Sequence, residues 1–143
     1  MFKYVHHIRF VVRSRDEFVA YMEANFGMEP FKQTDDRDEG HGKEAFYQIG
    51  QTELQIDEPA PGSPHAIFLE EHGPGIHHVG WGIDNAQQLA QELMAKGLTL
   101  RGSATRAGPE EMATRESGLG YMVINIAHKD TPGIAMQMVE ESR

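Results

Sequence analysis

The sequence predicts an α+β fold of two tandem βαβββ modules, each supplying a curved mixed sheet that lines a cavity. Two similar halves within 143 residues predict it, because each contains a strand-like run that opens on a His-His pair. The pairs end at His7 and His78, 71 residues apart, and the helices that follow close on Gly27 and Gly97, 70 residues apart. Only three segments show helical periodicity, which disfavours a helix-rich fold.

The first module, residues 1–60, is predicted to begin with a strand and a helix. Residues 4–12 are rich in β-branched and aromatic side chains, which is typical of a strand. Ser14 with Glu17 three residues later forms the pattern of a capping box, so a helix is expected to start there and to end at Gly27. Further strands are predicted over residues 29–33, 43–49 and 52–56, the last two as a hairpin.

A segment rich in proline and glycine leads out of the first module. It begins at residues 59–64, and a short helix is predicted over residues 65–72 before Gly-Pro-Gly at 73–75 ends it. Residues 61–74 are therefore assigned to a linker with a short helix, which joins the two modules.

The second module, residues 75–143, repeats the order of the first. A strand is predicted over residues 77–83, and a helix capped by Asp84 or Asn85 follows. The polar, irregular segment 102–117 is a candidate cover over a site. Because both modules are small, residues 1–143 are predicted to form a single domain. Short strands complete the module, at residues 98–101, 120–127 and 134–139.

Composition excludes several classes of protein. A formal net charge of −9 argues against a nucleic-acid partner, which requires a basic face. The absence of cysteine excludes disulfides, a thiolate nucleophile and a zinc–thiolate cluster, so any metal must be bound by nitrogen and oxygen. Without a signal-peptide pattern or an apolar run of membrane length, the chain is expected to be cytoplasmic and to have no membrane partner.

The alternation of side chains along the strands selects a candidate site. In a strand, alternate side chains share a face, and the more apolar set should pack against the helices. This leaves the second histidine of each pair on the concave face, while the first is assigned a structural role. Four potential metal ligands are then predicted, two from each half: His7, Gln55, His78 and Gln137. Glu44 is expected to overlook the same cavity.

A plainer explanation exists for each of these residues. A histidine on a strand is usually a hydrogen-bonded polar group, and a glutamine there usually faces solvent. The matched placement in both halves favours the metal hypothesis. The remaining histidines are interpreted as surface or turn residues: His41, His65, His72 and His128.

Four short segments carry a resemblance to a known superfamily. Residues 68–79 read FLEEHGPGIHHV and residues 50–59 read GQTELQIDEP; residues 127–130 and 133–139 read AHKD and GIAMQMV. Together they resemble the vicinal-oxygen-chelate superfamily of glyoxalases, bleomycin-resistance proteins and dioxygenases, and are most similar to its methylmalonyl-CoA epimerases. The resemblance covers nearly the whole chain and implies the glyoxalase-like fold and, commonly, a homodimer.

The resemblance also implies roles for the candidate residues. The metal histidines of the family fall on His7 and His78, its third ligand on Gln55, and a carboxylate that moves protons on Glu44. The implied cofactor is one divalent metal ion, which could be Co, Mn, Ni, Zn or Fe.

One position departs from the pattern of the family. The fourth ligand of the family is a glutamate, and the matching residue here is Gln137. An amide brings no negative charge to offset a divalent cation and cannot accept a proton usefully near neutral pH. Epimerisation needs two bases, so an isomerase or lyase step with one base fits this chain better than a strict epimerase.

Three functions remain open on the sequence alone. The first is a metal-dependent isomerase, epimerase or lyase that acts on a small carbonyl or acyl-thioester substrate through a metal-stabilised enolate. The second is a lyase of the glyoxalase I type, with a thiohemiacetal substrate. The third is a non-catalytic protein of the same fold that binds a small molecule such as a drug.

Overall fold

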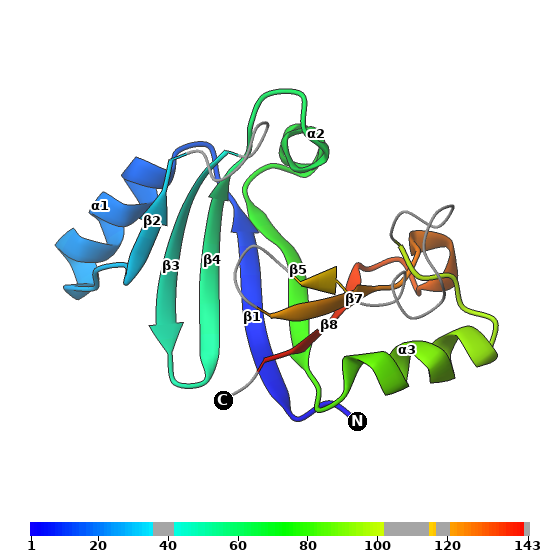
Figure 1. The fold of residues 1–143 in the computed structure, drawn as a ribbon. Coiled ribbons are helices and arrows are strands. Elements are labelled where there is room, and N and C mark those ends of the chain that lie inside the picture. Colours follow the sequence, from blue (N-terminus) through cyan, green and yellow to red (C-terminus); the bar gives the residue numbers. More distant parts are fainter. Residues whose placement is uncertain (36–41, 102–114, 117–120, 142–143) are drawn as a thin grey trace. The chain divides into compact units, whose positions relative to one another are not determined.

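The computed structural model describes residues 1–35, 42–101, 115–116 and 121–141 (Figure 1). Contacts between residues divide the chain into two compact units. The first unit is His7–His77, and the second unit combines Met1–His6 with His78–Arg143. The borders fall inside two strands, β1 (Tyr4–Val11) and β5 (Gly75–Gly82).

The first unit contains a sheet whose strands lie in the order β2-β3-β4-β1. Neighbouring strands pair antiparallel except β4 and β1, which are parallel. The connection between β1 and the hairpin contains α1 (Figure 1). The elements that follow β1 are α1 (Arg15–Phe26), β2 (Lys32–Thr34), β3 (Lys43–Ile49), β4 (Thr52–Glu58) and α2 (Pro64–His72).

Local sequence signals set the ends of α1. The Ser14 hydroxyl accepts a hydrogen bond from the backbone N–H of Glu17 at 3.1 Å, as the capping box predicts. At the other end Gly27 has a φ of 63°, a left-handed conformation that favours glycine, and its N–H donates to Glu23. Both predicted ends of this helix are therefore confirmed.

One face of the first sheet packs on α1. Ala45, Tyr47 and Ile56 are buried there, and side chains of β1 and α1, including Phe10 and Phe18, pack against them. The alternation along β3 and β4 turns the intervening polar residues to the opposite face. That polar face bears the candidate site.

The second unit repeats the same topology. Its strands lie in the order β5-β8-β7-β6, with β5 and β8 parallel and the other pairs antiparallel. Two βαβββ modules and a mixed sheet are thus confirmed as an α+β fold. The further elements are α3 (Ala86–Ala95), β6 (Arg115–Glu116), β7 (Met122–Asn125), the 3-10 turn η1 (His128–Asp130) and β8 (Met136–Glu140).

Helix α3 covers an apolar face of the second sheet. Ala86 and Ala90 of the helix are buried together with Ile124 and Met138 of the strands. Asn85 is the N-cap, because its side chain accepts from the N–H of Gln88 at 2.9 Å. The small alanines allow the helix to approach the sheet closely.

The predicted strand over residues 98–101 is wrong, since only a single bridge forms there, between Leu100 and Ile126. On the N-terminal side of this bridge the ladder does not extend, because the backbone N–H groups of Thr99 and Leu98 have other acceptors. That of Thr99 donates to the Asp130 carboxylate, and that of Leu98 to the carbonyl of Leu93 at the end of α3. The second strand of the module is β6, inside the segment 102–117 that the sequence predicts to be irregular. Most of that segment, including any role as a cover, lies outside the described residues.

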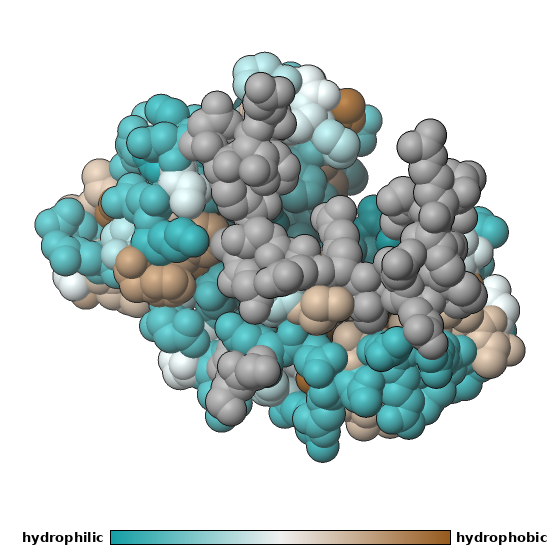
Figure 2. Space-filling model, viewed as in Figure 1, coloured by the Kyte–Doolittle hydropathy of each residue, from teal (hydrophilic) through white to brown (hydrophobic). Residues whose placement is uncertain are grey.

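The surface is predominantly hydrophilic on the face shown in Figure 2, with hydrophobic patches beside α1 and β2. This agrees with the content of 24% charged residues. Among the described residues, no helix combines the length and the apolar character that crossing a membrane requires.

Gly42, just before β3, lies against the backbone of the neighbouring strand end. A Cβ at this position would overlap the carbonyl oxygen of Glu58 and lie 2.7 Å from the N atom of Ala60. We expect Gly42→Ala to lower the free energy of unfolding by about 1–3 kcal/mol, because backbone atoms cannot yield as a flexible side chain can. Urea denaturation of the wild type and the variant measures this difference in the free energy of unfolding.

Gly75→Ala is the matched control, because a Cβ at Gly75 would meet no atom within 4 Å. Equal effects of the two substitutions would contradict the predicted contact at Gly42.

Candidate functional site

Five polar side chains are buried on the polar face of the first unit. They come from β1, β3 and β4, and the register explains their grouping. Arg9 lies opposite Gln55 in the parallel pair, and Glu44 lies opposite Asp57 in the hairpin. The exposed fractions are 1% for His7, 9% for Arg9, 0% for Glu44, 2% for Gln55 and 3% for Asp57. Charged side chains are rarely buried to this extent unless they are paired.

The guanidinium of Arg9 connects this group. Its Nη2 donates to Oε2 of Glu44 at 2.8 Å, and its Nη1 donates to Oε1 of Gln55 at 3.1 Å. Oδ2 of Asp57 lies 3.2 Å from Nε and 3.1 Å from Nη2. One cation therefore serves two carboxylates and one amide, an arrangement that the planar five-donor guanidinium suits well.

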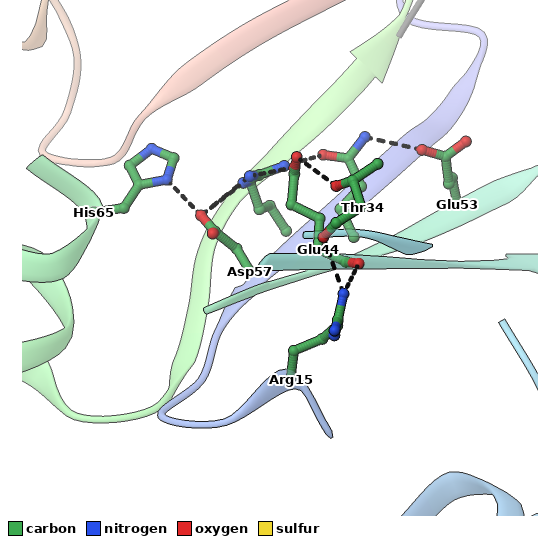
Figure 3. A network of polar contacts seen from close by, with 8 residues as sticks. Arg15, Thr34, Glu44, Glu53, Asp57 and His65 are labelled. Carbon is green, nitrogen blue, oxygen red and sulfur yellow. Dashed lines mark hydrogen bonds and ion pairs between the residues drawn. The ribbon is translucent and has the colours of Figure 1, made fainter. Parts of the chain in front are cut away.

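A second set of contacts holds the partners of Arg9. The Thr34 hydroxyl donates to Oε1 of Glu44 at 3.3 Å, and Nε2 of Gln55 donates to Glu53 at 3.0 Å. On the other side, Nδ1 of His65 lies 2.7 Å from Oδ2 of Asp57. Figure 3 shows Thr34 beside Glu44, and His65 on the far side of Asp57.

The start of α1 also positions Glu44, through its backbone. Nη1 of Arg15 donates to the carbonyl of Glu44 at 3.2 Å and to the carbonyl of Thr34 at 2.9 Å. Arg15 is itself 5% exposed. The guanidinium therefore ties the first turn of α1 to the β2–β3 pair at the point where the carboxylate projects.

The charges of the group shift two pKa values. Burial alone would lower the pKa of Arg9, but the carboxylates of Asp57 and Glu44 outweigh it and raise this pKa above its usual value. Burial alone would raise the pKa of Asp57, but the hydrogen bond from His65 and the charge of Arg9 hold it below its usual value. The ion pair between Arg9 and Asp57 is therefore present near neutral pH.

The structure brings the predicted site residues together within each unit. His7, Glu44 and Gln55 share the polar face of the first unit. In the second unit Gln137 lies opposite Gly80 in the ladder, and strand alternation puts His78 on the same face. Nε2 of Gln137 donates to Asn125 at 3.1 Å, which leaves its Oε1 as the group available to a ligand. That the two pairs form one metal site stays a prediction.

The donor set of the first unit does not fit a divalent cation. Oε1 of Gln55, the atom that would bind the metal, accepts a hydrogen bond from Arg9. A divalent ion on this oxygen would lie beside a guanidinium, and like charges at such distances repel by several kcal/mol even in a protein. Among the residues that the structure describes, no group of three or more His, Cys, Asp or Glu is arranged to hold a metal ion.

The other histidines of the pairs make structural contacts, consistent with their predicted role. Nε2 of His6 lies 2.9 Å from Oε2 of Glu141, and its ring meets the ring of Tyr121 at 4.5 Å. The ring of His77 lies 4.1 Å from that of His65 and 4.7 Å from that of Phe68.

His65, which the sequence predicts to be a surface or turn residue, is partly exposed and also contacts a buried carboxylate of the site. It is bound to Asp57 and its side chain is 34% exposed. The first turn of α2 brings it there, because Ser63 caps this helix through the N–H of Ala66. His72 and His128 are exposed as expected, and His41 lies outside the described residues.

The sequence reasoning missed Arg9, Asp57 and His65. A signal for two of them existed, because Arg9 follows His7 by two residues and Asp57 follows Gln55 by two. Strand alternation therefore places them on the same face as the chosen ligands. No comparable signal identifies His65, which reaches the face from a helix.

A surface pocket of about 420 Å³ lies elsewhere in the first unit, around the start of α1. Val12, Phe18 and Tyr21 contribute to its mostly apolar wall. It contains none of the predicted site residues.

Comparison with known proteins identifies the superfamily of the chain. Residues 6–114 match the family described as the glyoxalase/bleomycin resistance protein/dioxygenase superfamily. The chain belongs to this superfamily. The match includes the whole polar face of the first unit.

A curated relative is the uncharacterized protein YqjC of Bacillus subtilis (strain 168), which is 27% identical over 97 residues. The alignment covers 67% of this chain, and the chain spans 63% of the length of that relative.

Solved structures share the fold. The hypothetical protein BH1468 of Bacillus halodurans C-125 is 22% identical with a TM-score of 0.78, covering 98% of this chain and 95% of that protein. Methylmalonyl-CoA epimerase of Streptomyces coelicolor, in complex with 2-nitronate-propionyl-CoA, is 23% identical with a TM-score of 0.79, covering 99% and 96%. The epimerase of Mycobacterium tuberculosis is 20% identical with a TM-score of 0.78, covering 97% and 88%. These likenesses show the fold.

Removing the central cation should destabilise the first unit. We expect Arg9→Met to lower the free energy of unfolding by about 3–5 kcal/mol, because Glu44 and Asp57 are left buried without their cation. Chemical denaturation followed by circular dichroism measures this loss of unfolding free energy. Arg13→Met, at an exposed position, is the matched control, and an equal loss in both variants would rule out the stabilising role of Arg9.

The lowered pKa of Asp57 predicts a dependence of stability on pH. A carboxyl group whose pKa is lower in the folded than in the unfolded state stabilises the fold above its unfolded pKa, about 3.9. This contribution is lost as the pH falls through the folded pKa of Asp57. The difference in unfolding free energy between the wild type and Asp57→Asn should therefore shrink as the pH is lowered from about 7 towards 3.

Denaturation curves across this range test the prediction, with Asp84→Asn as the control, because the Asp84 side chain is 75% exposed. A difference between wild type and Asp57→Asn that stays constant with pH would contradict it.

Proposed function

We propose that this protein is an enzyme of the isomerase or epimerase type, which moves a proton at the carbon beside the carbonyl of a small acyl thioester. One observation carries the proposal: Glu44 is a fully buried carboxylate that a guanidinium and a hydroxyl hold in place. A buried, oriented acid–base group of this kind is characteristic of active sites. Membership of the superfamily and the fold shared with methylmalonyl-CoA epimerases support the choice of chemistry.

Glu44 is the proposed proton acceptor. Oε2 is bonded to Arg9 and Oε1 to Thr34, so the carboxylate has a fixed orientation on the polar face. Removal of a proton beside a carbonyl produces an enolate, whose negative oxygen must be stabilised where it forms. His7 and Gln55 lie on the same face and are candidates to contact the substrate.

The sequence prediction assigns the stabilisation of the enolate to a divalent metal ion at His7, Gln55, His78 and Gln137. Such an ion acts as a Lewis acid on the carbonyl oxygen when it is bound. The hydrogen bond from Arg9 to Gln55 does not favour a metal at this position. The proposal therefore assigns no step to a metal.

Two further functions are candidates. The satisfied contacts of Glu44 and Arg9 resemble those of a structural ion pair, which favours a non-catalytic binding protein of the same fold. A lyase of the glyoxalase type would use the same carboxylate. The homodimer and the cytoplasmic location expected from the sequence stay predictions.

Exchange of substrate protons with solvent tests the proposal. In deuterated water the wild-type protein should catalyse exchange of the α-proton of at least one member of a panel of acyl-CoA thioesters and 2-oxo compounds, followed by mass spectrometry. Glu44→Gln should lower the rate about 10²–10⁴-fold, the usual contribution of a general base.

Glu92→Gln, at an exposed position of α3, is the matched control and should leave the rate unchanged. Tight binding of a panel compound without any exchange would favour the binding protein. Exchange that is as fast in Glu44→Gln as in the wild type would remove Glu44 from the mechanism.

A further inference from the structure

We propose that Arg9 supplies the positive charge of the site, so that the protein works without a divalent metal ion. Arg9 would neutralise Glu44 before proton transfer and the enolate oxygen afterwards. This inference deepens the proposed function and depends on it for the reaction, while its statement about metal binding can be tested by itself.

The internal repeat shows that the two units differ at the position of Arg9. His7 and His78 are 71 residues apart, and the same offset matches Arg9 with Gly80. The second unit therefore has no side chain at the position where the first unit has a guanidinium. Gly80 faces Gln137 in its ladder as Arg9 faces Gln55. The two halves offer the same amide, but only one amide is bonded to a cation from its partner strand.

A second unusual residue accompanies Arg9. Asp57 lies on the same face, two residues after Gln55, and its Oδ2 lies within 3.2 Å of Nε of Arg9 and 3.1 Å of Nη2. In the second unit the matching residue, two positions after Gln137, is the apolar Val139. The first unit therefore has both a buried cation and a buried anion that holds it, so the guanidinium is a fixed part of this face.

The guanidinium retains capacity for a further acceptor. Of its five N–H groups, Nε–H and one on Nη2 point to Asp57, the other on Nη2 to Glu44, and one on Nη1 to Gln55. The second N–H of Nη1 has no acceptor among the described residues. Two hydrogen-bond donors of Arg9, this one and the one now on Glu44, are available to a developing oxyanion.

The net charge of the group and the substrate stays the same through the proton transfer. The C–H bond of the substrate breaks, its proton bonds to an oxygen of Glu44, and the electron pair moves onto the carbonyl oxygen as an enolate. Glu44 thereby loses the negative charge that Arg9 neutralised at 2.8 Å, and the enolate gains one. Because the cation is already placed and desolvated, little reorganisation is needed at the moment of transfer.

Cobalt binding tests the metal-free statement without any substrate. Titration of the purified wild type with Co²⁺, followed by visible absorption and by equilibrium dialysis, should show no stoichiometric binding. Arg9→Gly, which copies Gly80, should gain Co²⁺ binding that a second substitution, His7→Ala, abolishes. One Co²⁺ per wild-type chain, lost in His7→Ala, would overturn the inference whatever the substrate is.

Exchange of the α-proton tests the role of Arg9 in the reaction. Wild-type exchange should be unchanged after treatment with a chelator, and Arg9→Lys should lower it about 10²-fold, because an ammonium keeps the charge but loses the planar donors. Arg13→Lys is the matched control. Loss of wild-type exchange on chelation, restored by metal, would overturn metal independence, while exchange that is equally fast in Arg9→Lys would overturn the role of the guanidinium.

The inference stays testable even if one of the two variants of Arg9 does not fold. If circular dichroism shows that Arg9→Gly is unfolded, the Co²⁺ titration of the wild type still tests metal binding. The exchange rate of Arg9→Lys still tests the role of the guanidinium. If the wild type exchanges no compound, the proposed function fails, whereas a negative Co²⁺ titration would still support the metal-free site.

Discussion

The ion pairs of Arg9 on a buried sheet face are the interaction on which the first unit depends. Two carboxylates on neighbouring strands would repel each other strongly in such a place. A single guanidinium between Glu44 and Asp57 allows both to be buried, and it joins β1 to both strands of the hairpin. The apolar face on α1 supplies hydrophobic stabilisation, but the polar face determines which residues the fold can present to a ligand.

Comparison of the two units shows what is particular to the polar face of the first, because the second unit has the same topology. Both units have the same strand order and the same parallel pairing of first and last strands. Both carry a histidine and a glutamine at matched positions. They differ at Arg9 and Gly80, so the common fold tolerates either a charged side chain or a glycine opposite the glutamine. A difference within one molecule is informative, because it is independent of any likeness to other proteins.

Much of the fold could be predicted from local sequence, and the reasons are physical. Ser14, Glu17 and Gly27 fix the ends of α1 by short-range hydrogen bonds and backbone conformation, which neighbouring residues alone determine. Strand alternation likewise puts His7 and Gln55 on a common face. The partners of Arg9 could not be predicted in the same way, because they depend on the register between strands distant in the sequence. His65 depends on the placement of a helix, and β6 has only two residues, too few for a periodic pattern.

The borders of the units fall between the two members of each His-His pair. The first unit, His7–His77, is one continuous stretch of chain. The second unit requires Met1–His6 as well: the N–H of Lys3 donates to the carbonyl of Gly82, and His6 meets Glu141. During synthesis the first unit can therefore fold as soon as its own residues have left the ribosome. The second must hold its opening strand segment unpaired until the later residues arrive, and a loop about as long as the whole first unit closes last.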